Sequence, residues 1–361
     1  MITELTIRNF KSIQEVTLEC KKINIFIGEP NTGKSNLLEV FALLNLFGRD
    51  ETRYPLTTDD LRFIFRVSSW RQLFYWQDTS RELSISLLLS NGGTNNSYDL
   101  KFRYEEGNIS VAVSETQQGI AETSPLSYSY TLRADDLHPL SEIEYNRPSF
   151  SELQKLAFYR YRVRDDYKIL ESRFVVPPDA PNLVSLLLEN KELRSEVVRL
   201  INKYGYRLMI EPPTKTLKIE RGIDEDSFIV ISLPYSAVSD TLQRMVFNLA
   251  IVTCNRDMVI AMEEPEAHVF PYYVKYLAEK IAEDEQGNQF FITTHNPYFL
   301  LSVLEKGRTD DVNVFVTHYE NFETKVMQLS DEHKEELLDY GADAFFNLDA
   351  IMEKLGVVAG G

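Results

Sequence analysis

Residues 22–47 read KINIFIGEPNTGKSNLLEVFALLNLF, which combines an apolar strand pattern, a glycine-containing loop and an amphipathic helix pattern. The loop from Gly28 to Ser35 matches G-x-x-x-x-G-K-[ST], a motif that binds phosphate through inward-pointing backbone N–H groups. Gly28 and Gly33 let the backbone approach a polyphosphate closely, and Lys34 adds a positive charge for the β- and γ-phosphates. The Ser35 hydroxyl is suited to bind the accompanying Mg²⁺. The sequence therefore predicts a nucleotide site, in preference to a glycine-rich turn that happens to contain a lysine.

The composition is that of an acidic globular protein. The chain has 361 residues, 43% of them hydrophobic, and 55 acidic against 38 basic residues give a formal net charge of −17. This excess of negative charge argues against a globally electropositive surface for nucleic acid, although it leaves room for a local basic patch. Cys20 and Cys254 lie in apolar patterns without metal-ligand spacing, so we expect reduced core residues and no zinc site. The chain begins with a strand pattern and has no apolar run of membrane-spanning length, which predicts a cytoplasmic location and no membrane contact.

Hydrophobic patterns predict the elements of the first half of the chain. Ile2–Ile7 and Val16–Cys20 alternate apolar and polar residues and are expected to pair as strands. Residues 48–60 are polar and are expected to form a loop, whereas residues 61–130 show short alternating strands that predict an antiparallel β lobe. After a proline-rich approach, a helix is expected from about Leu183 to Tyr204.

The second half contains two continuous apolar runs, Met258–Met262 and Phe290–Thr294. Strands buried on both faces and separated by helices predict a mostly parallel sheet covered by helices. We therefore predict an α/β fold of the P-loop NTPase type, with a mixed, mostly parallel core sheet, an antiparallel β lobe and a helical insertion. The predicted domains are a nucleotide-binding head from residues 1–60 and 228–361, and an inserted β-rich and helical lobe from residues 61–227.

Polar side chains follow both apolar runs, at the strand ends where parallel sheets bind ligands. Glu263 and Glu264 fit a Walker B motif, in which the first carboxylate reaches Mg²⁺ and the second orients or deprotonates the attacking water. His295 ends the other run, and its ring is placed to donate to the γ-phosphate or to that water. The alternatives are a solvated acidic loop and a structural histidine, and the phosphate loop makes both less favoured. We predict Glu264, His295 and Lys34 as catalytic residues, and Ser35 and Glu263 as ligands of Mg²⁺.

Ser239, Asp240 and Thr241 open an apolar-periodic helix that is expected to run to about Val252. All three residue types are good helix caps, and capping is one interpretation of this segment. A helix N-terminus is also an anion site, so the segment is a candidate to face the γ-phosphate bound by a second subunit.

Taken together, these motifs resemble those of the ABC-type ATPases of the SMC, RecF and OLD group. The likeness covers about residues 1–50 and 230–300. The motifs that carry it, in chain order, are Asn9-Phe10-Lys11-Ser12, the phosphate loop running into Asn36-Leu37-Leu38-Glu39, Ser239 to Arg244, Glu263-Glu264-Pro265-Glu266-Ala267-His268 and Thr294-His295-Asn296-Pro297.

The resemblance implies that two heads sandwich two ATP molecules, each bound by one head's phosphate loop and the other head's signature motif. By position, Lys11 would contact phosphate in cis, Asn31 would lie near the γ-phosphate and Ser239–Gln243 would close the site in trans. The chain departs from the family where Asp240 and Thr241 replace the usual signature glycine. The residues expected to bind nucleotide are Lys11, Gly28, Asn31, Thr32, Gly33, Lys34, Ser35, Asn36, Ser239 and Thr241.

The function implied by the resemblance is ATP hydrolysis by an ATP-sandwiched homodimer that acts as a motor or switch in DNA maintenance or phage defence. No long coiled coil or Toprim domain is visible, so the output is expected to pass to a protein partner. The alternative is a slow-turnover regulatory module that reports nucleotide state to an effector or nuclease. Arg160, Arg162 and Arg164 would share one face of a strand and could meet nucleic-acid phosphates, but the net charge of −17 favours pairing with carboxylates.

Overall fold

The computed structural model describes most of the chain. The described residues are 1–48, 55–91, 94–117, 126–138, 150–168, 170, 172–211, 214, 216–222, 229–348 and 352–353.

The core is a six-stranded sheet in the order β15-β14-β3-β13-β12-β8. Every neighbouring pair in it is parallel except β14 with β15, so the predicted mixed, mostly parallel sheet is confirmed. The central strand β3 is buried at each of its six positions, which is why its sequence is continuously apolar apart from Asn24 and Gly28. The strands are β3 (Ile23–Gly28), β8 (Leu156–Tyr159), β12 (Val259–Glu263), β13 (Gln289–Thr293), β14 (Val312–Glu320) and β15 (Glu323–Gln328).

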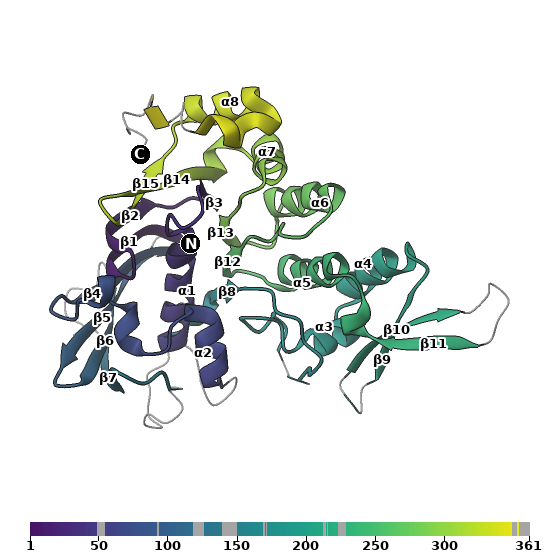
Figure 1. The fold of residues 1–361 in the computed structure, drawn as a ribbon, viewed down its shortest axis with the longest axis horizontal. Helices are drawn as coiled ribbons and strands as arrows, with labels where there is room; N and C mark the ends of the chain where they lie inside the picture. Colours follow the sequence, from purple (N-terminus) through teal and green to yellow (C-terminus); the bar gives the residue numbers. More distant parts are fainter. Residues whose placement is uncertain are drawn as a thin grey trace.

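Helices cover both faces of this sheet (Figure 1). Helix α1 (Lys34–Gly48) lies on one face, where the rings of Phe41 and Phe291 are 4.3 Å apart. Helices α5 (Asp240–Cys254), α6 (Pro271–Ala282) and α7 (Pro297–Lys306) share a hydrophobic core with Ile23, Ile25 and Ile27 of β3. Alternate residues of β3 therefore serve two separate cores, as expected of a strand buried on both faces.

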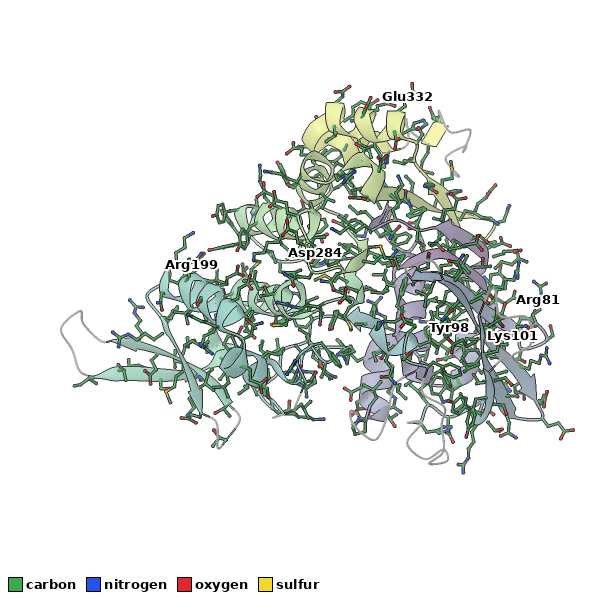
Figure 2. All side chains as sticks on the ribbon, turned by 180° about the vertical axis from the view of Figure 1, so that it is seen from behind. Arg81, Tyr98, Lys101, Arg199, Asp284 and Glu332 are labelled. Carbon is green, nitrogen blue, oxygen red and sulfur yellow. The ribbon has the colours of Figure 1, made fainter. Side chains whose placement is uncertain are left out.

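A second six-stranded sheet, in the order β2-β1-β4-β5-β6-β7, packs against the other side of α1. It is antiparallel throughout, which confirms the predicted β lobe, and β1 belongs to it because it pairs with β4. In Figure 2, Tyr98 and Lys101 lie on this sheet, and the Tyr98 side chain is buried on its inner face. The strands are β1 (Ile2–Phe10), β2 (Ile13–Glu19), β4 (Leu83–Asn91), β5 (Thr94–Glu105), β6 (Asn108–Gln117) and β7 (Leu126–Arg133).

Two local predictions are wrong. The loop expected up to residue 60 and the strands expected from residue 61 are interrupted by α2 (Thr58–Phe65), which Thr57 and Asp60 cap reciprocally. The single helix expected from Leu183 to Tyr204 is two helices, α3 (Leu183–Glu189) and α4 (Lys191–Asn202). The break is at Asn190, which has extended backbone angles and accepts a hydrogen bond from the Leu193 N–H as the cap of α4.

The remaining elements lie around these layers. A small antiparallel sheet in the order β11-β10-β9 projects beside α3 and α4 (Figure 1). It consists of β9 (Arg207–Glu211), β10 (Thr216–Gly222) and β11 (Val230–Pro234), and α8 (Asp331–Tyr340) follows β15. Short 3₁₀ helices are Trp70–Leu73, Tyr75–Gln77, Leu153–Lys155, Tyr235–Ala237, Thr309–Asp311 and Gly341–Asn347.

Two further sequence-based predictions concern organisation and location. The predicted division into a head and an inserted lobe (61–227) stays a prediction, but β8 and β4 from that range pair with β12 and β1 of the predicted head. Among the described residues, no helix combines the length and apolar character needed to cross a bilayer. The cytoplasmic location stays a prediction.

Candidate nucleotide site

The phosphate loop turns between β3 and α1 in a space that excludes side chains at both of its glycines. Gly28 has φ +144° and Gly33 has φ +92°, in the region that L-residues with side chains rarely adopt. A Cβ at Gly28 would lie 2.2 Å from the Thr317 carbonyl oxygen, and one at Gly33 would lie 2.0 Å from Thr324 Oγ1. Strands β14 and β15 thus pack directly against the loop. Glycine is required at both positions because of the positive φ angle and because a side chain would clash with these strands.

Lys34 starts α1, and its ammonium group turns back into the loop. Nζ donates to the carbonyl oxygens of Gly28 at 2.9 Å and Glu29 at 2.5 Å, and the residue is only 5% exposed. Burial lowers the pKa of Lys34 to about 8, against the opposing effect of the Glu264 and Glu29 carboxylates. A phosphate anion would relieve this desolvation by supplying a negative charge, so the loop is electrostatically prepared for one.

A cavity of about 610 Å³ opens in front of this loop. It brings together residues from the ends of β3, β12 and β13, as the sequence predicted from their positions after apolar runs. The roles of these residues in catalysis stay predictions. The cavity is lined by Ser12, Pro30, Asn31, Gly33, Lys34, Ser35, Asn36, Arg66, Arg160, Tyr161, Arg244, Glu263, Glu264, Ala267, His268, His295 and Tyr319.

Ser35 and Glu263 both line the cavity, close enough for the Ser35 hydroxyl to contribute to lowering the pKa of Glu263. Burial alone would raise the pKa of Glu263, but the Arg160 and Arg66 guanidinium groups outweigh it and hold that pKa below its usual value. A hydroxyl and an ionised carboxylate fit Mg²⁺, which keeps several waters and takes its other ligands from phosphate oxygens. In the described part of the chain no cluster of three or more His, Cys, Asp or Glu residues could hold a metal by itself.

Glu264 and His295 face each other at the mouth of the cavity. Their Oε1 and Nε2 atoms are 3.7 Å apart, and their side chains are 42% and 35% exposed. Glu264 has φ +42°, and its backbone N–H donates to the Thr293 carbonyl oxygen at 3.1 Å, so the turn after β12 is fixed to β13. Burial and the nearby Lys34 charge lower the pKa of His295, against the effect of Glu264. The ring is therefore neutral at pH 7 and can donate one proton while accepting another.

The buried Glu266 side chain holds the backbone that carries His295, next to Glu264. Its Oε1 accepts hydrogen bonds from Thr294 Oγ1 at 2.7 Å and from the His295 backbone N–H at 3.0 Å. The side chain is buried, which raises its pKa to about 7 although these hydrogen bonds oppose the shift. The loop after β12 and the end of β13 are thereby joined by one carboxyl group.

Arg66 and Arg160 are site residues that sequence reasoning did not assign to the nucleotide site. Arg66 ends α2 and its Nη2 is 2.7 Å from Glu263 Oε1. Arg160 contacts Glu263 through Nε and lies 3.3 Å from Glu39, a carboxyl group buried on α1. Neither arginine belongs to a motif with a characteristic spacing, so the sequence contains no signal that identifies either one as a nucleotide-site residue.

The strand predicted for Arg160, Arg162 and Arg164 is wrong, because β8 ends at Tyr159 and the chain leaves the sheet. All three side chains are paired with carboxylates, as the net charge favoured. Arg162 contacts Asp60 at 2.7 Å and Arg164 contacts Asp179 at 2.8 Å. The surface available to nucleic-acid phosphates at these arginines is correspondingly small.

Of the remaining residues predicted to bind nucleotide, one lies under the phosphate loop and three lie outside the cavity lining. Thr32 is buried under the loop and its hydroxyl is 2.7 Å from that of Thr317. Lys11 does not line the cavity: its ammonium contacts the buried Glu39 carboxylate and donates to the Phe65 carbonyl oxygen at 2.5 Å. Ser239 and Thr241 also lie outside the cavity of their own chain.

The chain is similar to a known protein family, to a named protein and to solved structures. Residues 1–120 match the family model described as an AAA ATPase domain. A protein of Helicobacter pylori named ATP/GTP phosphatase is 23% identical over 330 residues, which cover 83% of this chain and 86% of that protein. Among solved structures, the SMC head domain from Thermotoga maritima is 12% identical with a TM-score of 0.46, covering 91% of this chain and 99% of that one. An SmcHead bound to the C-winged helix domain of ScpA is 15% identical with a TM-score of 0.48, covering 92% and 99%.

Proposed function

From the match to an AAA ATPase domain, we propose that this P-loop ATPase is of the SMC- and RecF-like type, and that two copies bind two ATP molecules between them and hydrolyse them at Glu264. The resulting opening and closing of the dimer acts as a motor or switch in DNA maintenance or phage defence, with a protein partner receiving the output.

The reaction in one site uses the groups that converge on the cavity. The loop N–H groups and Lys34 bind the triphosphate, and Ser35 and Glu263 hold the Mg²⁺ that neutralises its charge. Glu264 accepts a proton from the attacking water, and the neutral His295 ring donates to the γ-phosphate oxygens. Glu266 is a positioning residue, because it holds the backbone that carries His295.

The observation that best supports a dimer with ATP between its two copies is the uncapped N-terminus of α5. Ser239 is exposed at the cap position, yet its side chain makes no capping hydrogen bond within the part of the chain that the structure describes. The first N–H groups of a 15-residue helix are then available to an anion that the same chain does not supply. Asp240, the departure from the family signature, is paired with Arg244 at 2.7 Å, and this reduces its repulsion of a phosphate.

The test is the mass in solution of Glu264→Gln, measured by light scattering with and without Mg·ATP. Because this variant binds ATP but does not hydrolyse it, the mass should rise with ATP from that of one chain, 41.8 kDa, to that of two. Lys34→Ala serves as the control that cannot bind ATP and should keep the mass of one chain. A Glu264→Gln mass that ATP leaves unchanged would contradict the sandwich.

A slow-turnover regulatory module is the second candidate, favoured by Asp240 alone. A carboxylate in the first turn of α5 is unfavourable beside a γ-phosphate, even when Arg244 neutralises part of its charge. Such a module would bind ATP with normal affinity, turn over far more slowly than about 1 per second and signal the bound state to an effector. Steady-state phosphate release separates the two candidates.

A further inference from the structure

The strand order gives the nucleotide cavity two chemically different sides. Strands β13 and β12, which carry His295 and Glu264 at their ends, lie on one side of β3, and β14 lies on the other. In the proposed function the γ-phosphate faces Glu264 and His295. The ribose and base must then leave the phosphate loop toward β14.

Tyr319 is an aromatic side chain on that second side. Strand β14 runs parallel to β3 with Thr317 opposite Gly28, so Tyr319 lies two residues, or about 7 Å, beyond the start of the phosphate loop. Thr317 and Tyr319 share one face of β14 because alternate strand residues do, and Thr317 already contacts Thr32 of the loop. Tyr319 lines the cavity, and it is 39% exposed.

A chain of hydrogen bonds joins the start of α1 to the strand pair that carries Tyr319. Asn36 follows the phosphate motif and donates from Nδ2 to Ser12 Oγ at 2.7 Å. Ser12 Oγ lies 2.7 Å from Thr324 Oγ1, and Thr324 is directly opposite Tyr319 across β14 and β15. Hydrogen bonds therefore connect the start of α1 to the strand pair that carries Tyr319 without a break, and Tyr319 is held in place on a strand.

We propose that Tyr319 stacks on the base of the bound nucleotide and sets its preference for purines. The inference rests on the proposed ATPase function and extends it to recognition of the base. Stacking depends on ring area and not on the hydrogen-bonding edge of the base, so ATP and GTP bind alike, whereas CTP and UTP bind less tightly.

Isothermal titration of the full chain with Mg·ATP and with Mg·tripolyphosphate tests this assignment. Tripolyphosphate has no base, so it reports the phosphate loop alone. Tyr319→Ala should raise the Kd for ATP by about 5- to 150-fold and leave that for tripolyphosphate unchanged, whereas Tyr319→Phe should retain the wild-type value for ATP. Phe322→Ala is the matched control: it removes an aromatic residue, 74% exposed, from the turn of the same strand pair and outside the cavity lining, so both Kd values should stay unchanged.

The outcomes separate this inference from the function it rests on. If Tyr319→Ala weakens both ligands equally, or leaves ATP binding intact, the stacking role is refuted while the phosphate loop stands. If CTP binds the wild type as tightly as ATP, the purine preference is refuted. A wild-type chain that binds neither ATP nor tripolyphosphate would refute the proposed function, and the stacking role with it.

Discussion

The buried ammonium of Lys34 predicts an unusual pH dependence of folding stability. Its pKa is about 8 in the folded chain against 10.5 for an ordinary lysine, because burial in the loop disfavours the charged form. Between these two values the unfolded chain binds more protons than the folded chain. The free energy of unfolding therefore rises as the pH increases from about 8 to 10.5. Below pH 8 both states are protonated, so this pH-dependent gain in stability is absent.

The magnitude follows from the size of the shift. A difference of 2.5 units (10.5 − 8) corresponds to at most about 3.4 kcal/mol. Water has partial access to the cavity, so we take about half of that, and only part of the titration falls between pH 7.5 and 10. The free energy of unfolding of the wild type, relative to Lys34→Met, should therefore increase by about 1–2 kcal/mol over this interval.

Urea unfolding of both chains at pH 7.5 and 10, without nucleotide, measures this difference directly. Lys34→Met keeps the length of the side chain and removes its charge, and the other titrating groups cancel in the comparison. A wild-type-to-variant difference that stays constant with pH, or that moves in the opposite direction, would show that Lys34 is not desolvated in the loop.

Three further predictions concern the groups around the cavity. Glu264→Gln should lower the rate of phosphate release by about 10²- to 10⁴-fold while ATP still binds, and an unchanged rate would remove Glu264 from the reaction. Glu266 has a pKa raised to about 7 from 4.5, so the folded chain retains a proton that the unfolded chain has lost, and wild-type stability falls as the pH rises through this range. Relative to the wild type, Glu266→Gln should gain about 2–4 kcal/mol between pH 4.5 and 7.5 in thermal unfolding; equal pH profiles would contradict the assignment. Arg160→Met removes one of the two cations that pair with each of the buried carboxylates of Glu39 and Glu263, which keep Lys11 and Arg66, and should cost up to about 3–5 kcal/mol in urea unfolding. Its control, Arg62→Met, breaks an exposed ion pair and should cost under about 1 kcal/mol; similar losses in the two variants would show that the buried pairs carry no special weight.

The parts of the site that could be predicted from sequence are those with local signals. The motif from Gly28 to Ser35 determines its own backbone geometry, and Glu264 and His295 directly follow runs whose apolar character marks them as buried strands. Because parallel strands end at the same edge of a sheet, these three separate segments could be placed around one cavity without knowledge of the strand order.

The parts that sequence reasoning missed depend on contacts between distant segments or on weak local signals. Arg66 reaches Glu263 only because α2 forms, and the cap of α2 pairs Thr57 with Asp60, where the usual signature has glutamate or glutamine. Apolar periodicity continues across Asn190, so the break between α3 and α4 was hidden by the helical pattern on both sides. Arg160 is recognisable as a site residue only once β8 is known to lie beside β12.

The central claim is that each ATP is hydrolysed between Lys34 of one copy and the start of α5 in the other. The most direct measurement is steady-state phosphate release from an equimolar mixture of Lys34→Ala and Ser239→Arg, each inactive alone. Lys34→Ala lacks the phosphate loop's cation, and Ser239→Arg fills the helix N-terminus with a long side chain. Half of the dimers in the mixture combine the two variants and have one intact site of two, so we predict about one quarter of the wild-type rate. A mixture as inactive as its separate components would contradict a site shared between two copies.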